Sequence, residues 1–288
     1  MILGSTAVYW TEYVSAGPGG WNLLRVPSAG GATMTLASPQ DYPTGLAVDS
    51  THVYWTDQGD GSLDGGAIVR MPAAGGTQTA LVSGRPAPTA IATDGTNVYW
   101  TESSCGGAVC TGNVLAVPAG GGTPTTLASH IGGGTWLFAA RGQLYWTTSD
   151  GRVLTVPTTG GTPRQLAYEQ TTGVAVVADS QAAYWTNNSG DVMRLPLDGG
   201  APAVLALGQA PTGGLAVDES NVYWTNSGSF GATNTADAVL AVPLGGGAPT
   251  TIASLDGSAP IGVAVDKTSL YFMYTAAQNT GIVKVTPK

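Results

Sequence analysis

The chain has 288 residues, and only 10% of them are charged, well below the roughly 25% that is usual in soluble proteins. Its net charge is −8 with ten Lys plus Arg, which argues against nucleic acid as a partner, because that binding depends on basic groups that neutralise phosphates. The acidic balance also disfavours docking on anionic lipid, and no apolar run is long enough to predict insertion into a membrane.

One triplet recurs along the whole chain. It occurs as Tyr9-Trp10-Thr11, Tyr54-Trp55-Thr56, Tyr99-Trp100-Thr101, Tyr145-Trp146-Thr147, Tyr184-Trp185-Thr186 and Tyr223-Trp224-Thr225, with a divergent seventh copy at Tyr271-Phe272-Met273. The tyrosines are 39 to 48 residues apart. This spacing is typical of a propeller blade with four strands, whose repeat is about 40–45 residues.

Each repeat contains four short apolar runs separated by turn residues. In chain order they resemble Gly45–Asp49, then the triplet, then Ile68–Pro72, then Thr123–Ala128. Runs rich in Val, Ile, Thr, Tyr and Trp and bounded by Gly, Pro, Asp and Asn predict strands. A Pro-x-x-Gly-Gly turn joins the third and fourth runs, and a polar turn that begins with Asp joins the first two.

The sequence therefore predicts an all-β, seven-bladed β-propeller of four-stranded antiparallel blades, with almost no helix. We expect a single domain over 1–288, with repeats over approximately 1–38, 45–83, 89–129, 134–168, 173–207, 214–254 and 262–288. The seventh repeat stops after its third run, Ile282–Val285. We therefore expect a three-stranded last blade with an exposed edge, and a longer precursor that would carry the missing strand before Met1.

The repeat resembles the Tyr-Trp-Thr-Asp (YWTD) propellers of the LDL-receptor type. Val53-Tyr54-Trp55-Thr56-Asp57 is the full motif, and Ile68-Val69-Arg70 fits the strand that follows it. The family's domains have six blades where this chain has seven repeats, and the motif's Asp survives only at Asp57. The composition, rich in Ala, Gly and Thr, also resembles repeat proteins of high-GC bacteria. The resemblance implies architecture and transfers function poorly.

The seven triplets have two interpretations. They are ligand sites of a propeller lectin, or they are core strands whose Trp side chains fill the wedge between blades, and the second interpretation is favoured. Cys105 and Cys110 lie four residues apart within a Gly-rich hairpin. Their spacing predicts a local disulfide in a secreted or periplasmic protein, with two free thiols as the alternative.

Asp60 and Asp64 have the Asp-x-Ser-x-Asp-Gly spacing that opens many calcium loops. The twelfth position, where an EF-hand has an acidic residue, is Met71. A solvated acidic hairpin is therefore the stronger interpretation, and a Ca²⁺ site is the alternative. The two histidines, His52 and His130, suffice for neither a zinc site nor a catalytic triad. Streptogramin lyases, which are also seven-bladed propellers, depend on histidines that this chain lacks.

The loops after the triplets and the links between repeats are irregular in length, whereas the other turns are short and alike. Loops with more than turn chemistry favour a binding role. We expect a protein, small-molecule or carbohydrate ligand to bind there, through Trp21, Tyr42, Asp57, Asp60 and Phe230. The favoured function is a secreted or periplasmic binding or scaffold propeller without catalysis. The alternatives are a lyase- or hydrolase-type enzyme with a divalent cation, and a propeller lectin.

Overall fold

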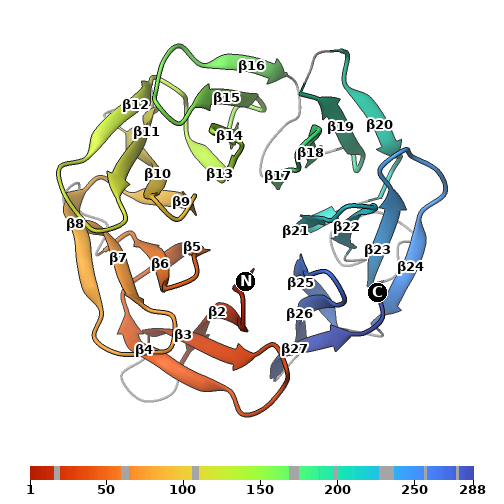
Figure 1. The fold of residues 1–288 in the computed structure, drawn as a ribbon, viewed down its shortest axis with the longest axis horizontal. Helices are drawn as coiled ribbons and strands as arrows, with labels where there is room; N and C mark the ends of the chain where they lie inside the picture. The colour runs from red at the N-terminus through yellow and green to blue at the C-terminus, as the bar shows by residue number, and fades with distance from the viewer. Residues whose placement is uncertain are drawn as a thin grey trace. The chain divides into compact units, whose positions relative to one another are not determined.

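The computed structural model of the chain is an all-β propeller of seven blades (Figure 1). It describes residues 1–15, 20–59, 65–105, 110–168, 175–187, 189–197, 200–209, 211–226, 237–255, 258–276 and 279–288. Six antiparallel sheets have four strands and the last has three, and each sheet consists of strands that are consecutive in the chain. The predicted fold class is confirmed, including the incomplete last blade.

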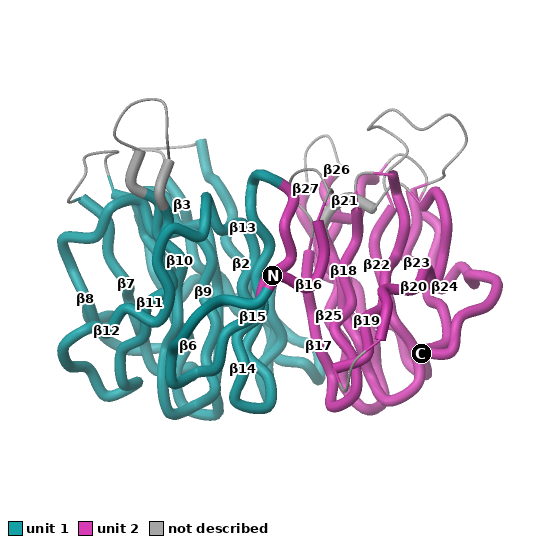
Figure 2. The backbone as a smooth tube through the Cα atoms, turned by 90° about the horizontal axis from the view of Figure 1, so that it is seen from above, with its two compact units in different colours: residues 1–150, 155–164 teal, residues 151–154, 165–288 magenta. Residues whose placement is uncertain are grey.

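The structure divides into two compact units (Figure 2): Met1–Asp150 with Thr155–Arg164, and Gly151–Leu154 with Gln165–Lys288. The boundary lies within blade four, so the prediction of one domain over 1–288 stays a prediction. In the described part of the chain, no helix is long and apolar enough to cross a membrane.

The first unit holds blades one to three and most of blade four. Blade one contains β1 (Ile2–Leu3), β2 (Ala7–Val14), β3 (Gly20–Pro27) and β4 (Met34–Gln40). Blade two contains β5 (Pro43–Val48), β6 (His52–Asp57), β7 (Gly66–Pro72) and β8 (Thr79–Arg85). Blade three contains β9 (Pro88–Thr93), β10 (Asn97–Cys105), β11 (Cys110–Pro118) and β12 (Thr125–Ser129). Blade four contains β13 (Gly134–Ala140), β14 (Gln143–Thr148), β15 (Val153–Pro157) and β16 (Arg164–Ala167).

The second unit holds blades five to seven. Blade five contains β17 (Val176–Ala178), β18 (Ala182–Thr186), β19 (Val192–Pro196) and β20 (Ala203–Ala206). Blade six contains β21 (Pro211–Val217), β22 (Asn221–Asn226), β23 (Ala238–Pro243) and β24 (Thr250–Ser254). Blade seven contains β25 (Ala259–Val265), β26 (Leu270–Ala276) and β27 (Asn279–Val285).

The threonine of the triplet links neighbouring blades of the first unit. Thr56 Oγ1 lies 3.0 Å from Thr44 Oγ1 in its own blade and donates to the Thr89 carbonyl of blade three at 2.6 Å. Thr101 Oγ1 lies 2.8 Å from Thr89 Oγ1, which in turn donates to the Gly134 carbonyl of blade four at 2.9 Å. These hydroxyls are buried at little cost, because they are hydrogen-bonded.

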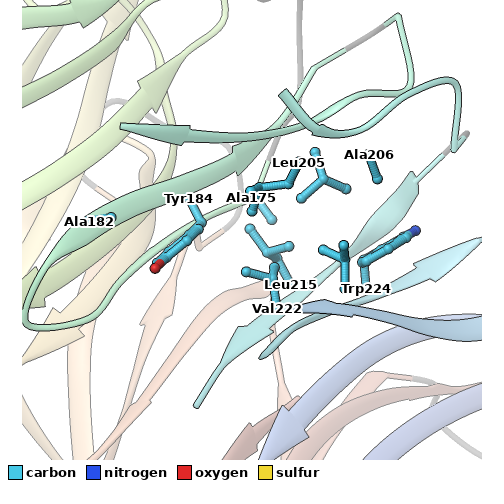
Figure 3. Close-up of a cluster of buried hydrophobic side chains, with 10 residues drawn as sticks. Ala175, Ala182, Tyr184, Leu205, Ala206, Leu215, Val222 and Trp224 are labelled. Atoms are coloured by element: carbon cyan, nitrogen blue, oxygen red, sulfur yellow. The ribbon is translucent and has the colours of Figure 1, made fainter. Parts of the chain in front are cut away.

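The tryptophan of the triplet packs against the preceding blade, as Figure 3 shows for the second unit. Trp224 of blade six joins a buried cluster with Tyr184, Leu205 and Ala206 of blade five. In the first unit, Trp55 lies in a cluster with Tyr9 of blade one. The triplet is therefore core, as predicted, and the lectin interpretation that used its indoles as ligand sites is wrong because they are buried.

Candidate functional site

The two ends of a blade differ. We call the end that carries the β-turns between strands one and two and between strands three and four the uniform end, and the opposite end the irregular end. Five blades share one turn at the uniform end. The Asp that opens the turn accepts, through Oδ1, the backbone N–H groups two and three residues further along the chain. Oδ2 of the same Asp accepts the hydroxyl of the triplet Tyr at 2.7 to 3.0 Å. The pairs are Asp49–Tyr54, Asp94–Tyr99, Asp179–Tyr184, Asp218–Tyr223 and Asp266–Tyr271.

In the turn of blade three, burial and hydrogen bonding shift the pKa values of both Asp94 and Tyr99. Burial alone would raise the pKa of Asp94, but hydrogen bonds from the Asn97 N–H, the Tyr99 hydroxyl and the Thr96 N–H outweigh it, so the pKa lies below its usual value. Burial, and then the hydrogen bond to Asp94, raises the pKa of Tyr99 to about 12. Perturbed groups often mark active sites. Here the same arrangement repeats in five blades, each Asp bonds to its own turn, and only Asp218 also makes a described ion pair outside it, with Lys288, so the turns are structural.

The irregular end of blade one carries three aromatic side chains in contact, which we call the aromatic patch: Tyr13, Trp21 and Tyr42. Tyr13 on β2 is the cross-strand partner of Trp21 on β3, and their ring centroids are 5.6 Å apart at 65°. Tyr42, in the link from β4 to β5, lies 5.9 Å from Trp21 at 74°. Both contacts are edge-to-face, the geometry that aromatic quadrupoles favour. Tyr13 is 58% exposed and Tyr42 50% exposed, so the patch faces solvent.

Asp57 at the end of β6 fixes the position of Tyr42. Its Oδ1 accepts the Tyr42 N–H at 3.3 Å and the Gly59 N–H at 2.9 Å, and the Gln58 N–H is donated to the Tyr42 carbonyl at 3.1 Å. The structure thus brings three predicted site residues together, namely Trp21, Tyr42 and Asp57. Tyr13 was missed, because it follows the triplet by only two residues and reads as the end of a core strand.

A buried charge network lies at the irregular end of blade three. Arg85 makes a bidentate ion pair with Glu102, with Nε–Oε2 and Nη2–Oε1 distances of 2.9 and 2.5 Å. Trp100 Nε1 donates to Glu102 Oε2 at 3.0 Å, and the guanidinium lies 6.0 Å from the Trp100 ring centroid. Glu102 is only 2% exposed. The pair joins β8 of blade two to β10 of blade three, and Glu102, with all of its described partners inside this network, is not a free ligand group.

Trp136 is an exposed aromatic residue that the sequence analysis missed. It lies on β13, the first strand of blade four, and is 39% exposed. The register places it one residue before the partner of the triplet Trp, a position that is small in blades two, three and six, where it is Gly45, Ala90 and Gly214. The signal was available, since Trp136 and Trp21 are the two tryptophans outside the triplets.

The remaining predicted site residues lie wholly or partly outside the described residues. Asp60, Asp64 and Phe230 lie wholly outside them, so the calcium interpretation and the role of Phe230 stay predictions. Cys105 and Cys110 are direct cross-strand partners in the β10–β11 hairpin. That pairing brings two Cα atoms within the range that a disulfide accepts, but the side chains are among those not described.

Metal-binding groups and histidines do not converge in the described part of the chain. A search of those residues finds no group of three or more His, Cys, Asp or Glu side chains that would hold a metal ion. His52 begins β6 at the uniform end, where its N–H is donated to Asp49 at 2.8 Å, in agreement with a turn role. His130 follows β12 with a φ of 58°.

No protein-family model matches the sequence, and no curated protein matches it. Among solved structures, an oligogalacturonate lyase in complex with manganese has a TM-score of 0.69 at 11% identity, over 98% of this chain and 86% of that chain. The β-propeller domain of the Trilobed protease from Pyrococcus furiosus, described as having an open velcro topology, has a TM-score of 0.68 at 7% identity, over 99% and 95%. The computationally designed Ika8 protein has a TM-score of 0.63 at 14% identity, over 99% and 95%. At such identities the likeness shows the propeller fold alone.

Proposed function

We propose that the chain is a non-catalytic binding propeller that holds a protein partner against the aromatic patch. The observation that carries this proposal is the contact geometry of Tyr13, Trp21 and Tyr42, together with the exposure of the two tyrosines. A blade needs no aromatic ring at that position for its own core, since its triplet side chains are already buried. Clustered, ordered Tyr and Trp side chains are the usual anchors of protein–protein interfaces.

The charge around the patch favours a basic partner. Asp41 is exposed beside Tyr42, Asp57 lies beneath it, and the whole chain carries a net charge of −8. Lys and Arg side chains are attracted both by such a field and by the faces of Tyr and Trp rings. The preferred partner is therefore a protein segment with Lys or Arg beside apolar side chains. Nucleic acid and membrane insertion stay outside the proposal for the reasons of charge and composition given above.

An enzyme is the alternative, because one similar structure is a lyase with bound manganese. A lyase site of that kind needs converging metal ligands or titratable groups. The described part of the chain supplies no such group of metal ligands, and its carboxylates with shifted pKa values belong to turns. A carbohydrate ligand on the same aromatic patch would make the protein a lectin, which is the third candidate.

A secreted or periplasmic location is part of the proposal and depends on the disulfide between Cys105 and Cys110. A disulfide persists in an oxidising compartment. Thiol titration of the unfolded, unreduced protein should detect no free thiol. Two free thiols would remove the support for this location.

The function is tested by selecting ligands for the wild-type protein from a displayed random-peptide library, with a Tyr13→Ser/Tyr42→Ser variant for counter-selection. We expect enriched peptides that combine Lys or Arg with apolar residues and that bind the variant at least about tenfold more weakly. Parallel assays place the protein on a glycan array and with oligogalacturonate plus Mn²⁺, followed by ultraviolet absorbance of the unsaturated product. Lyase activity that EDTA abolishes, or glycan binding without peptide binding, would overturn the proposal.

A further inference from the structure

The fourth strands of the six complete blades share one pattern. Two exposed residues are followed by an apolar pair that is buried or partly buried: Leu36-Ala37, Leu81-Val82, Leu127-Ala128, Leu166-Ala167, Leu205-Ala206 and Ile252-Ala253. Two consecutive inward side chains do not fit a regular strand, whose side chains alternate. In five of these blades the pairing with the third strand shifts at this point, which leaves the Leu or Ile as the extra residue of a β-bulge.

The bulged residue packs on the next blade of its own unit. A Cβ placed on Gly75, in the Pro-x-x-Gly-Gly turn of blade two, would lie 3.4 Å from Leu36 Cδ2 of blade one. The turns of blades three, four and six are covered in the same way by the bulged leucine of the preceding fourth strand. At Gly30, the equivalent glycine of blade one, such a Cβ would find no atom within 4 Å. The described chain thus has one turn that lacks the leucine a fourth strand supplies elsewhere.

In the described part of the chain, blade seven lacks the fourth strand that carries this Leu or Ile in the other blades. Its order is β25-β26-β27, so β27 is its outer edge. Two β27 residues, Ile282 and Val285, have the same register as Val239 and Val242 of blade six. The blade six residues are fully buried, whereas Ile282 and Val285 are only partly buried. An edge with unpaired backbone groups and half-buried apolar side chains accepts an added strand.

We propose that the outer edge of β27 binds, as an antiparallel fourth strand, an extended polypeptide segment in which two solvent-facing residues are followed by Leu-Ala or Ile-Ala. The complete blades define this occupant, because five of their six fourth strands present this pattern to the same edge. A second copy of β27 does not fit as well. Its apolar pair, Ile282-Val283, ends in Val, whereas five of the six fourth strands have Ala at that position.

The probe is a synthetic peptide with the sequence of residues 247–255, the fourth strand of blade six. Added to the whole protein, it should raise the Tm saturably, by about 2 °C or more near saturation. It should also slow hydrogen exchange at β27 amides without changing exchange at β23. The matched control is the same peptide N-methylated at alternate residues, which keeps the side chains and removes ladder donors.

An unchanged Tm together with unchanged β27 exchange would overturn the inference, as would an equal effect of the N-methylated peptide. Sedimentation velocity supplies a further readout. A concentration-dependent dimer that the peptide dissociates would identify a second copy as the occupant and refute the one proposed. These outcomes are independent of the aromatic patch, which lies on a different blade and is left unchanged in the experiment.

Discussion

Tyrosine side chains are buried and hydrogen-bonded at one end of the blades and exposed to solvent at the other. At the uniform end, Tyr54 and Tyr99 are fully buried and each hydroxyl is held by the Asp of its own turn. At the irregular end, Tyr13 and Tyr42 expose half or more of their surface and contact only one other ring, Trp21. The first arrangement recurs in five blades, and the second occurs once among the described residues. The contrast supports the proposal made above, in which the uniform end and the core stabilise the fold and the irregular end binds the partner.

The largest difference in the free energy of unfolding should be between substitutions of two tryptophans. Trp100→Ala removes a fully buried side chain and should lower the free energy of unfolding by about 3–5 kcal/mol. Trp21→Ala removes a partly buried side chain from the aromatic patch and should cost less, about 1–2 kcal/mol. Urea unfolding of both variants measures the difference. Equal losses would show that the patch is part of the core.

A second effect tests whether Glu102 is structural despite its place at the irregular end. Glu102→Ala leaves Arg85 without its ion-pair partner and Trp100 Nε1 without its acceptor, so it should cost about 3 kcal/mol. The double variant Glu102→Ala/Arg85→Ala should recover part of that loss in a double-mutant cycle. If Glu102→Ala instead abolishes ligand binding at unchanged stability, the assignment of this network to the scaffold is wrong.

The repeated turn should give a smaller effect. Asp94→Ala removes the acceptor for two backbone N–H groups and the Tyr99 hydroxyl, and should cost about 1–3 kcal/mol. Its matched control is Asp41→Ala, an exposed carboxylate beside the patch, which should change stability by no more than about 0.5 kcal/mol. A neutral Asp94→Ala would mean that the turns are not the folding device described above.

The same turns predict how stability varies with pH. The folded pKa of Asp94 is depressed, so its contribution is present above the unfolded pKa of about 3.9 and is lost as pH falls through the folded value. The folded pKa of Tyr99 is raised to about 12, so its contribution is present below about pH 10 and is lost between there and about pH 12. Urea unfolding across pH should show both limits. Tyr99→Phe should reduce the alkaline loss and, because it removes one of the donors to Asp94, part of the acid loss as well. An alkaline limit unaffected by that substitution would contradict the role given to the turn.

The sequence predicted the propeller because its signals are local. A triplet, an Asp-led turn and a Pro-x-x-Gly-Gly turn each act within a few residues, so seven spaced copies suffice to define seven sheets. The hydrogen bond from Tyr99 to Asp94 was missed because five residues of a hairpin must fold before the two meet. The candidate site was predicted only in part. Tyr42 lies in the link between two blades, and its contact with Trp21 depends on how that link folds, which the spacing of residues in the sequence does not predict.

Binding by matched variants at the two ends tests the central claim most directly. Isothermal titration with the selected basic peptide would compare the wild type, Tyr13→Ser/Tyr42→Ser at the irregular end and Asp94→Ala/Tyr99→Phe at the uniform end, each with its unfolding curve. We predict that the first variant loses at least about tenfold in affinity at unchanged stability, and that the second is less stable but binds as the wild type does. A peptide that binds the Tyr13→Ser/Tyr42→Ser variant normally and the Asp94→Ala/Tyr99→Phe variant weakly, below its unfolding transition, would contradict the account.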